Sequence, residues 1–326
     1  MPSRRIDVPR ARLGENADLS INQRPDVLFI AGSGHSGSTL LELLLCTDPA
    51  FIGVGEVFQL LDPRNDAIRR RTGESCACGT PIAECEFWSP ILPLLLQPES
   101  LPPWAKYDIV LSAIRERFGP DFTLVDSSKT LRALHAAAAV PDVDLRVVHM
   151  VRDVRSWSVA MQKVYRRQRE QAGSDRRSST LRRTLRKVRH NRFLDFWEWD
   201  RLNRQVQDFA LDHNVPTLLL MYEELCFRLE DSMERLGEFV GLTFDREMLR
   251  PAIGNSHNVF GNRMRFEPGK LAQVRYDHHW FRSTEWVAPA LLFPHVMKHN
   301  SLLYEHHGCV TAELRTRVVQ GGGKSA

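Results

Sequence analysis

Five short apolar runs recur along the chain, separated by longer amphipathic stretches. They lie at 27–31, 51–55, 122–126, 145–151 and 217–222, and their hydrophobic residues are continuous rather than alternating with polar ones. Continuous apolar runs of this length are typical of parallel strands buried on both faces. The pattern therefore predicts five strands of a parallel sheet.

Stretches with the apolar spacing of helices lie between these runs. They span residues 38–46, 130–140, about 154–213 and 230–241. Strand and helix in repeated alternation predict an α/β fold, a doubly wound parallel sheet flanked by helices with right-handed crossovers. In such sheets ligands bind beyond the carboxyl ends of the strands.

The breaks in the pattern predict loops within a single domain. Gly and Pro cluster at 61–66, 97–104 and 267–270, which indicates loops rather than domain boundaries. We predict one domain over 26–310, preceded by an extension at 1–25 and followed by a flexible tail at 311–326.

Composition narrows the class of protein. The chain has 326 residues, of which 43% are hydrophobic, enough for a sizeable core and too many for a disordered or fibrous protein. The N-terminus is charged, and no 18 consecutive apolar residues occur, so we expect neither a signal peptide nor a transmembrane segment. Six cysteines fit a reducing compartment, and we expect a cytoplasmic protein.

The positive charge is concentrated in one segment. Twelve Lys or Arg residues and two acids lie between Lys163 and Arg192, a net charge of +10 against +4 for the whole chain. We predict a basic helical insertion at about 160–195, which could be a solvated helical hairpin, a lid, or a dock for an acidic acceptor or an anionic membrane surface. Apart from Tyr165, this segment has no aromatic residue before Phe193, which disfavours a nucleic-acid groove.

The segment "GSGHSGST", residues 32–39, follows the first predicted strand and opens the first predicted helix. Its glycines and hydroxyls suit an anion nest at a helix N-terminus, although a Gly/Ser turn that caps the helix is the alternative. Ser38 stands where a P-loop kinase carries the lysine that grips a triphosphate. A phosphosulfate carries less charge and needs no obligatory metal, so the P-loop-like segment fits such a donor better.

Five further stretches, in order, resemble one enzyme family. "AGSGHSGSTLL" resembles the 5′-phosphosulfate loop of sulfotransferases that use 3′-phosphoadenosine 5′-phosphosulfate (PAPS). "FIGVGEVFQL", "LVDSSKTLRAL", "VHMVRDVRSWSVAM" and "LLLMYEELC" followed by "LGEFVGLTFD" are similar to later family segments, and "SHNVFGNRMRF" to a stretch of bacterial members. The chain thus resembles a bacterial sulfotransferase similar to the tyrosylprotein and carbohydrate types. The resemblance implies PAPS as sulfuryl donor, no required metal, and an acceptor hydroxyl on a carbohydrate, a lipid or a small metabolite.

The resemblance assigns catalytic roles to three residues. Glu56, which follows the second strand, would be the general base, although an exposed loop carboxylate is the alternative. Lys129 would contact the leaving bridging oxygen, a role that explains a cation at a helix start. His35 stands where the family usually has Arg or Lys, and it could be a protonated cation, a neutral donor or the base itself.

The resemblance also assigns nucleotide contacts. Arg152 would pair with the 3′-phosphate, with Ser158 or Ser156 in place of the usual serine, since that position holds Ala160. Tyr222 would lie against the adenine unless it is a core residue. The remaining candidates are the loop residues Gly34, His35, Ser36, Gly37, Ser38 and Thr39, which would hold the 5′-phosphate, and His257, Asn262 and Arg265, which would line the nucleotide or the acceptor.

Two other classes of protein are alternatives to the sulfotransferase interpretation. In a P-loop kinase, Asp126 would bind Mg²⁺, whereas in a sulfotransferase it would position Lys129 or cap the following helix with Ser127 and Ser128. A catalytically inactive nucleotide-binding protein would tolerate the unusual His35 and Ala160.

Cys76, Cys78 and Cys85 cluster in "CACGTPIAEC". They could be three zinc ligands awaiting a fourth, a disulfide with a spare thiol, or free thiols in a loop, and no second CxxC or HxxxH lies nearby. The sequence leaves these three interpretations open.

Overall fold

The structure is a computed structural model of the chain. It describes residues 24–62, 64, 73–96, 101–172, 191–245, 249, 256–261, 266 and 274–307. Residues 1–23 of the predicted extension, residues 173–190 of the basic segment and the predicted tail lie outside the described residues.

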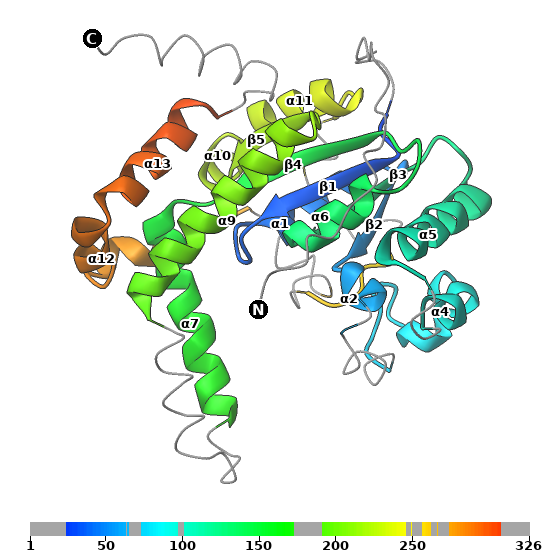
Figure 1. Ribbon diagram of the computed structural model, residues 1–326, viewed down its shortest axis with the longest axis horizontal. Helices are drawn as coiled ribbons and strands as arrows, with labels where there is room; N and C mark the ends of the chain where they lie inside the picture. The colour runs from blue at the N-terminus through cyan, green and yellow to red at the C-terminus, as the bar shows by residue number, and fades with distance from the viewer. Residues whose placement is uncertain are drawn as a thin grey trace, which may run out of the picture. The chain divides into compact units, whose positions relative to one another are not determined.

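Five strands form one sheet in the order β2-β3-β1-β4-β5 (Figure 1). The strands are β1 (Val27–Gly32), β2 (Phe51–Gly55), β3 (Thr123–Lys129), β4 (Leu145–Val151) and β5 (Thr217–Met221). The pairs β1/β3 and β2/β3 run parallel. The chain visits β2 and β3 on one side of β1 and then β4 and β5 on the other, which is the doubly wound order and confirms the predicted fold class.

The predicted strands match the observed ones closely except at the end of β3. The apolar run stops near Val125, whereas the strand continues to Lys129 through Asp126, Ser127 and Ser128, which are all buried. Buried polar groups require hydrogen-bond partners, and these three side chains find theirs inside the fold. Polar residues could therefore extend a buried strand beyond its apolar run.

The chain folds into two compact units. Among the described residues, unit 1 comprises those up to 31, those from 39 to 147 and those from 233 to 266. Unit 2 comprises those from 32 to 38, from 148 to 232 and from 274 to 307, so that β4 is divided between the units.

Unit 1 is built on β1, β2 and β3, whose residues are buried almost throughout. Its helical segments are α1 (Ser38–Leu45), α2 (Phe58–Leu61), η1 (Ile82–Glu84), α4 (Trp88–Leu96), α5 (Pro103–Phe118), α6 (Leu131–Ala138) and most of α11 (Leu229–Val240). Helix α5 packs against α2, α4 and α6 (Figure 1).

Unit 2 packs its helices around an aromatic core. They are α7 (Val154–Ala172), α9 (Arg192–Asp212), α10 (Tyr222–Phe227), η5 (His279–Arg282), α12 (Val287–Leu292) and α13 (Pro294–Glu305). Helix α9 packs against α7, α12 and α13 (Figure 1). Trp157, Phe196 and Trp199 lie at the centre of the buried cluster with aliphatic residues of β4, β5 and α13.

Helix boundaries were the weakest sequence prediction. The stretch expected to be helical from about 154 to 213 is divided in the structure into α7 and α9, with 173–190 outside the described residues. Residues 97–104 were expected to form a loop, but α5 begins at Pro103. Proline suits the first turn of a helix because the amide that it lacks has no intrahelical partner there.

Among the residues that the structure describes, no helix combines the length and the apolar character that crossing a bilayer requires.

A buried carboxylate joins three elements of unit 1. Glu42 of α1 is 1% exposed; its Oε1 accepts a hydrogen bond from the Gly55 amide at 2.8 Å, and its Oε2 accepts one from Ser127 Oγ at 2.7 Å. Burial raises the pKa of Glu42 to about 7, although both hydrogen bonds act in the opposite direction. Glu42 therefore connects α1 to the carboxyl ends of β2 and β3. Because the carboxylate is buried, its ionisation lowers the stability of the folded chain.

We predict that Glu42→Gln removes a pH dependence of stability. The folded chain holds the Glu42 proton up to about pH 7, whereas the unfolded chain releases it near the ordinary value of 4.5. The free energy of unfolding should therefore fall as pH rises through this window, by about 3 kcal/mol from this one group. Urea unfolding at pH 5 and at pH 8 measures the fall, which should be smaller in Glu42→Gln than in the wild type. The control Glu116→Gln, on the exposed face of α5, should keep the wild-type fall, and an unchanged pH dependence in Glu42→Gln would contradict the prediction.

Candidate active site

The loop between β1 and α1 depends on two glycines for its backbone conformation. Gly32 and Gly37 have φ angles of 137° and 95°, in the region that favours glycine. A Cβ on Gly32 would lie 2.2 Å from the Met150 carbonyl oxygen, and one on Gly37 would lie 2.7 Å from the Tyr222 ring. The tight packing requires glycine at both positions, as the phosphate-loop interpretation expects.

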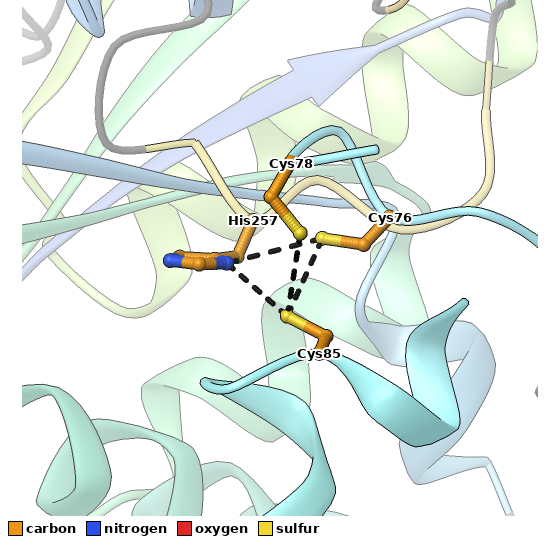
Figure 2. A group of neighbouring side chains, drawn as sticks. All are labelled: Cys76, Cys78, Cys85 and His257. Atoms are coloured by element: carbon orange, nitrogen blue, oxygen red, sulfur yellow. Dashed lines mark hydrogen bonds between the residues drawn. The ribbon is translucent and has the colours of Figure 1, made fainter. Parts of the chain in front are cut away.

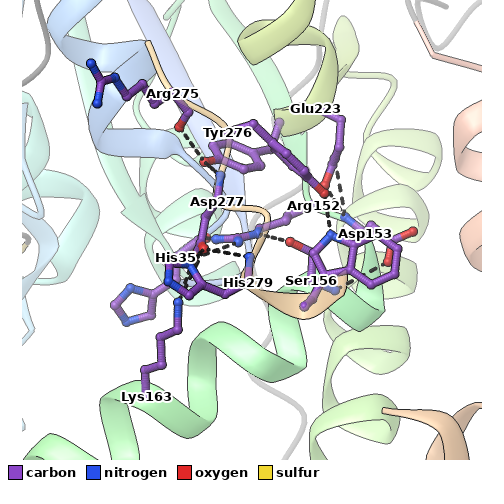
Figure 3. Close-up of polar contacts among 12 residues, drawn as sticks. His35, Arg152, Asp153, Ser156, Lys163, Glu223, Arg275, Tyr276, Asp277 and His279 are labelled. Atoms are coloured by element: carbon purple, nitrogen blue, oxygen red, sulfur yellow. Dashed lines mark hydrogen bonds and ion pairs between the residues drawn. The ribbon is translucent and has the colours of Figure 1, made fainter. Parts of the chain in front are cut away.

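Side chains of unit 2 fix the exposed crest of this loop. Trp157 Nε1 donates to the Gly34 carbonyl oxygen at 2.7 Å, and Arg152 Nη1 donates to the His35 carbonyl oxygen at 3.2 Å (Figure 3). Gly34 and His35 are exposed, whereas Ser36 and Ser38 are buried. These two hydrogen bonds to loop carbonyls hold the loop in one conformation without a ligand.

Arg152 is the centre of a polar cluster just after β4. Its side chain is 7% exposed; Nε donates to Ser156 Oγ at 2.8 Å, and Nη2 lies 3.4 Å from Asp277 Oδ2 (Figure 3). The guanidinium lies over the Tyr222 ring, 4.6 Å from its centroid. Ser156, Asp277 and the Tyr222 ring thus hold the Arg152 guanidinium in one position.

The segment that carries Arg152 is itself held by hydrogen bonds. Trp199 Nε1 donates to the Arg152 carbonyl oxygen at 2.9 Å, and Asn300 Oδ1 accepts from the Val154 amide at 2.9 Å. The Asn300 amide also donates to Asp153 Oδ2 at 3.1 Å. Helices α9 and α13 thus position the turn that follows β4.

Asp277 joins three cationic or basic groups around this cluster. Besides Arg152, it accepts from Lys163 Nζ at 3.2 Å and lies 2.5 Å from His279 Nδ1 (Figure 3). Partial burial acts to raise the Asp277 pKa, but the hydrogen bonds from His279 and Lys163 outweigh it and hold the pKa below its usual value. No local signal in the sequence marked Asp277, because two of its partners, Arg152 and Lys163, lie more than a hundred residues away.

The two serines considered for the Arg152 contact point to different partners. Ser156 holds the guanidinium, whereas Ser158 Oγ donates to Asp195 Oδ2 at 3.4 Å and is 1% exposed. Tyr222 is 8% exposed, and its hydroxyl lies 3.4 Å from the amide of Asp277, which donates to it. Tyr222 therefore combines a mostly buried ring with a contact to the Arg152 cluster.

Glu56 and Lys129 meet in unit 1. Glu56 follows β2, and Lys129 is the last residue of β3. Lys129 Nζ donates to Glu56 Oε1 at 2.7 Å, and the side-chain amide of Gln59 donates to Glu56 Oε2. The two side chains are 23% and 13% exposed, so both reach solvent from a largely buried position. The pairing of β1 with β3 places Lys129 beside Ala31, the residue that precedes the glycine-rich loop.

Backbone strain coincides with two of the predicted catalytic residues. His35 and Lys129 have φ angles of 65° and 63°, which non-glycine residues rarely adopt. Such conformations cost about 1–3 kcal/mol each and persist where the surrounding structure imposes them, often at functional sites.

Asp126 is enclosed by protein groups. It is 0% exposed, accepts from the Tyr107 hydroxyl at 2.9 Å and from the Ser128 amide at 2.7 Å, and burial raises its pKa to about 6. The helix that follows is capped instead by Thr130, whose hydroxyl accepts from the Ala133 amide. Arg265 and Asn262 lie outside the described residues.

A family model described as the sulfotransferase family matches residues 25–246, more than half of the chain. Among solved structures, the sulfotransferase domain from the curacin biosynthetic pathway shares 17% identity, with a TM-score of 0.51 over 83% of this chain and 98% of that one. The sulfotransferase domain of the Synechococcus PCC 7002 olefin synthase shares 18% identity, with a TM-score of 0.43 over 83% and 87%. Sulfotransferase STF9 from Mycobacterium avium shares 14% identity, with a TM-score of 0.48 over 85% and 77%.

No curated protein matches the chain. The curacin-pathway domain is similar in fold alone at this level of identity, and it agrees with the doubly wound sheet described above. The family match covers both the loop after β1 and the segments that carry Glu56, Lys129 and Arg152. It confirms the resemblance seen in the sequence, and the chain belongs to the sulfotransferase family.

Proposed function

We propose that this protein transfers the sulfuryl group of PAPS to a hydroxyl of an acceptor by direct in-line displacement, with Glu56 as general base. The observation that carries the proposal is the 2.7 Å contact between Glu56 and Lys129 at the ends of β2 and β3. A base and a cation held together at the carboxyl edge of a parallel sheet are what transfer of a sulfuryl group to a hydroxyl requires.

The loop after β1 supports PAPS as the donor. Residues Gly34 to Thr39 would hold the 5′-phosphate through backbone amides and hydroxyls at the start of α1. Ser38 replaces the lysine that neutralises a triphosphate, so the loop matches a phosphosulfate, which carries less charge than a triphosphate. When bound, PAPS supplies the activated sulfuryl group, and the chain supplies position, charge and a proton acceptor.

The Arg152 cluster supports recognition of the 3′-phosphate. A guanidinium fork suits a phosphate, and Arg152 already has Ser156 as a neighbouring hydroxyl donor. The Tyr222 ring, packed under the guanidinium, would border the adenine. Ser158 is the alternative hydroxyl from the sequence, but its contact with Asp195 favours Ser156 in this role.

Glu56 and Lys129 would divide the chemistry between them. Glu56 accepts the proton of the acceptor hydroxyl, whose oxygen then forms the new S–O bond as the bond to the bridging oxygen breaks. Lys129 stabilises the negative charge that collects on the bridging oxygen. His35, held on the exposed crest of the loop by its carbonyl, would add a donor to the transferring group.

The burial of Asp126 counts against the kinase alternative. A metal-binding aspartate must present an oxygen to Mg²⁺, whereas both Asp126 oxygens accept hydrogen bonds from protein groups and the residue is 0% exposed. The acceptor would be a hydroxyl-bearing carbohydrate, lipid or small metabolite, and the choice among them would depend on loops rather than on the sheet.

The choice of donor is tested by binding and by label transfer. Calorimetry without Mg²⁺ should detect adenosine 3′,5′-bisphosphate, and ³⁵S-labelled PAPS should label an acceptor in an extract of the native host, again without Mg²⁺. Binding of Mg²⁺–ATP with refusal of the bisphosphate would contradict the proposal. Bisphosphate binding without label transfer to any acceptor would instead favour a catalytically inactive nucleotide-binding protein.

We predict that Glu56→Gln lowers kcat by about 10²- to 10⁴-fold, since a general base contributes that much. Affinity for adenosine 3′,5′-bisphosphate should change little, because Glu56 contacts the acceptor proton rather than the nucleotide. The exposed carboxylate of Glu238, changed to Gln, serves as a matched control and should retain activity. Wild-type turnover in Glu56→Gln would move the role of base to another residue, His35 first.

Arg152→Lys should erase discrimination between nucleotides with and without a 3′-phosphate. We expect affinity for adenosine 3′,5′-bisphosphate to fall by about 10- to 100-fold while AMP binding falls less, because lysine cannot present two donors in a fork. The ratio of the two affinities separates this role from a general loss of structure. Arg166→Lys, on the exposed surface of α7, is the control, and equal losses for both nucleotides would disprove the assignment.

A further inference from the structure

Four side chains from two distant segments of unit 1 converge in a cluster that sulfuryl transfer does not use. They are Cys76, Cys78, Cys85 and His257, and their ligand atoms all lie within 4.8 Å of one another (Figure 2). Cys76 and Cys85 are buried, His257 is half-buried, and Cys78 is exposed. Figure 2 shows the three sulfurs and the ring nitrogen turned toward one centre.

The separations are those of ligands around one tetrahedral ion. Cys85 Sγ lies 3.6 Å from Cys78 Sγ and 3.7 Å from Cys76 Sγ. His257 Nδ1 lies 3.3 Å from Cys85 Sγ and 3.9 Å from Cys76 Sγ. With Zn–S bonds of about 2.3 Å and Zn–N bonds of about 2.0 Å, tetrahedral angles require S–S distances of about 3.8 Å and S–N distances of about 3.5 Å.

We infer that Cys76, Cys78, Cys85 and His257 form a structural zinc site. Three thiolates and one imidazole are a ligand set that Zn²⁺ prefers, and four protein ligands leave no open position for catalysis. The sulfurs are too far apart for a disulfide, whose S–S bond is about 2.05 Å. A zinc site is one of the three interpretations that the sequence left open for the three cysteines. The zinc would have a structural role and would take no part in the proposed sulfuryl transfer, which requires no metal.

The cysteine segment is folded to present its sulfurs. The Cys76 amide donates to the Thr80 carbonyl at 2.8 Å, and the Gly79 amide donates to the Cys76 carbonyl at 3.0 Å. Gly79 has a φ of 94°, which a glycine tolerates best, and the resulting tight turn brings Cys78 back beside Cys76. Cys85 follows η1, and its carbonyl accepts from the Ser89 amide at the start of α4. Backbone hydrogen bonds thus hold the three thiols on one side of the segment.

His257 is fixed in the cluster from the other segment. Its ring stacks on Phe87 at a centroid distance of 5.0 Å, and its carbonyl accepts from Trp88 Nε1 at 2.7 Å. The Ala77 amide donates to the carbonyl of the next residue, Asn258, at 3.0 Å. The two segments therefore already pack together around the place where the metal would bind them.

The site has a consequence for Glu56. The strand-like segment after His257 pairs with the end of β2, and the Glu56 amide donates to the Val259 carbonyl at 3.0 Å. A Cβ on Gly261 would lie 3.1 Å from Glu56 Oε1, so this segment also borders the carboxylate. Zinc would therefore anchor the segment after His257, which borders Glu56 and is far in sequence from the three cysteines.

The test is the metal content of the full chain, purified under reducing conditions. Mass spectrometry of the metals should find about one zinc ion per chain, and Cys85→Ser should lower it by about tenfold or more. Cys226→Ser is the matched control, since Cys226 is a free thiol of unit 2 outside the cluster, and it should keep the zinc. Wild-type protein that is purified without zinc and also fails to bind added Co²⁺ would contradict the site.

Cobalt provides a readout that does not depend on how a variant folds. Wild-type protein stripped by a chelator and refilled with Co²⁺ should show thiolate-to-cobalt charge transfer and the visible bands of a tetrahedral ion. Folded, reduced protein that holds no zinc and gives neither absorption would overturn the inference. So would a disulfide among the three cysteines in metal-free protein, detected by mass before and after reduction. None of these outcomes depends on PAPS or on an acceptor, so they leave the proposed function to its own tests.

Discussion

The buried carboxylate of Glu42 is the interaction on which the geometry of unit 1 depends. One oxygen holds the amide of Gly55, the residue before Glu56, and the other holds the hydroxyl of Ser127, two residues before Lys129. Parallel strands end at one edge of a sheet, where their last backbone groups need partners that the sheet does not provide. Glu42 supplies them from α1, at the desolvation cost that raises its pKa.

Because β2 and β3 are held in this way, their two polar ends meet. Glu56 and Lys129 form a short contact, and Lys129 adopts a strained backbone that unit 1 imposes. In unit 2, the loop after β1 is held through its carbonyls while Arg152 is buried between Ser156, Tyr222 and Asp277. Packing and hydrogen bonds therefore fix charged side chains in place in both units, as the proposed catalysis by preorganised groups would require.

The cysteine cluster would also hold a segment beside Glu56 in place. The segment around His257 borders Glu56 and pairs through its backbone with the end of β2. A metal bound by Cys76, Cys78, Cys85 and His257 would add a second attachment that joins this segment to the cysteine segment. In this view, Glu42 supports the proposed catalytic pair, Glu56 and Lys129, from α1, and the proposed zinc site supports it from the segment after residue 256.

The sequence alone determined the elements whose signals are local. Continuous apolar runs marked the strands, and the order of strand, glycine-rich loop and helix marked the loop after β1 as a candidate phosphate site, because burial on both faces and backbone turns are read from neighbouring residues. It also placed Glu56, Lys129 and Arg152 at strand ends. Only the tertiary structure decided which side chains meet: His257 joins a cysteine 172 residues away, Asp277 joins Lys163, and Ser156 rather than Ser158 holds Arg152. Such pairings depend on how distant segments pack, and no periodicity within one segment encodes them.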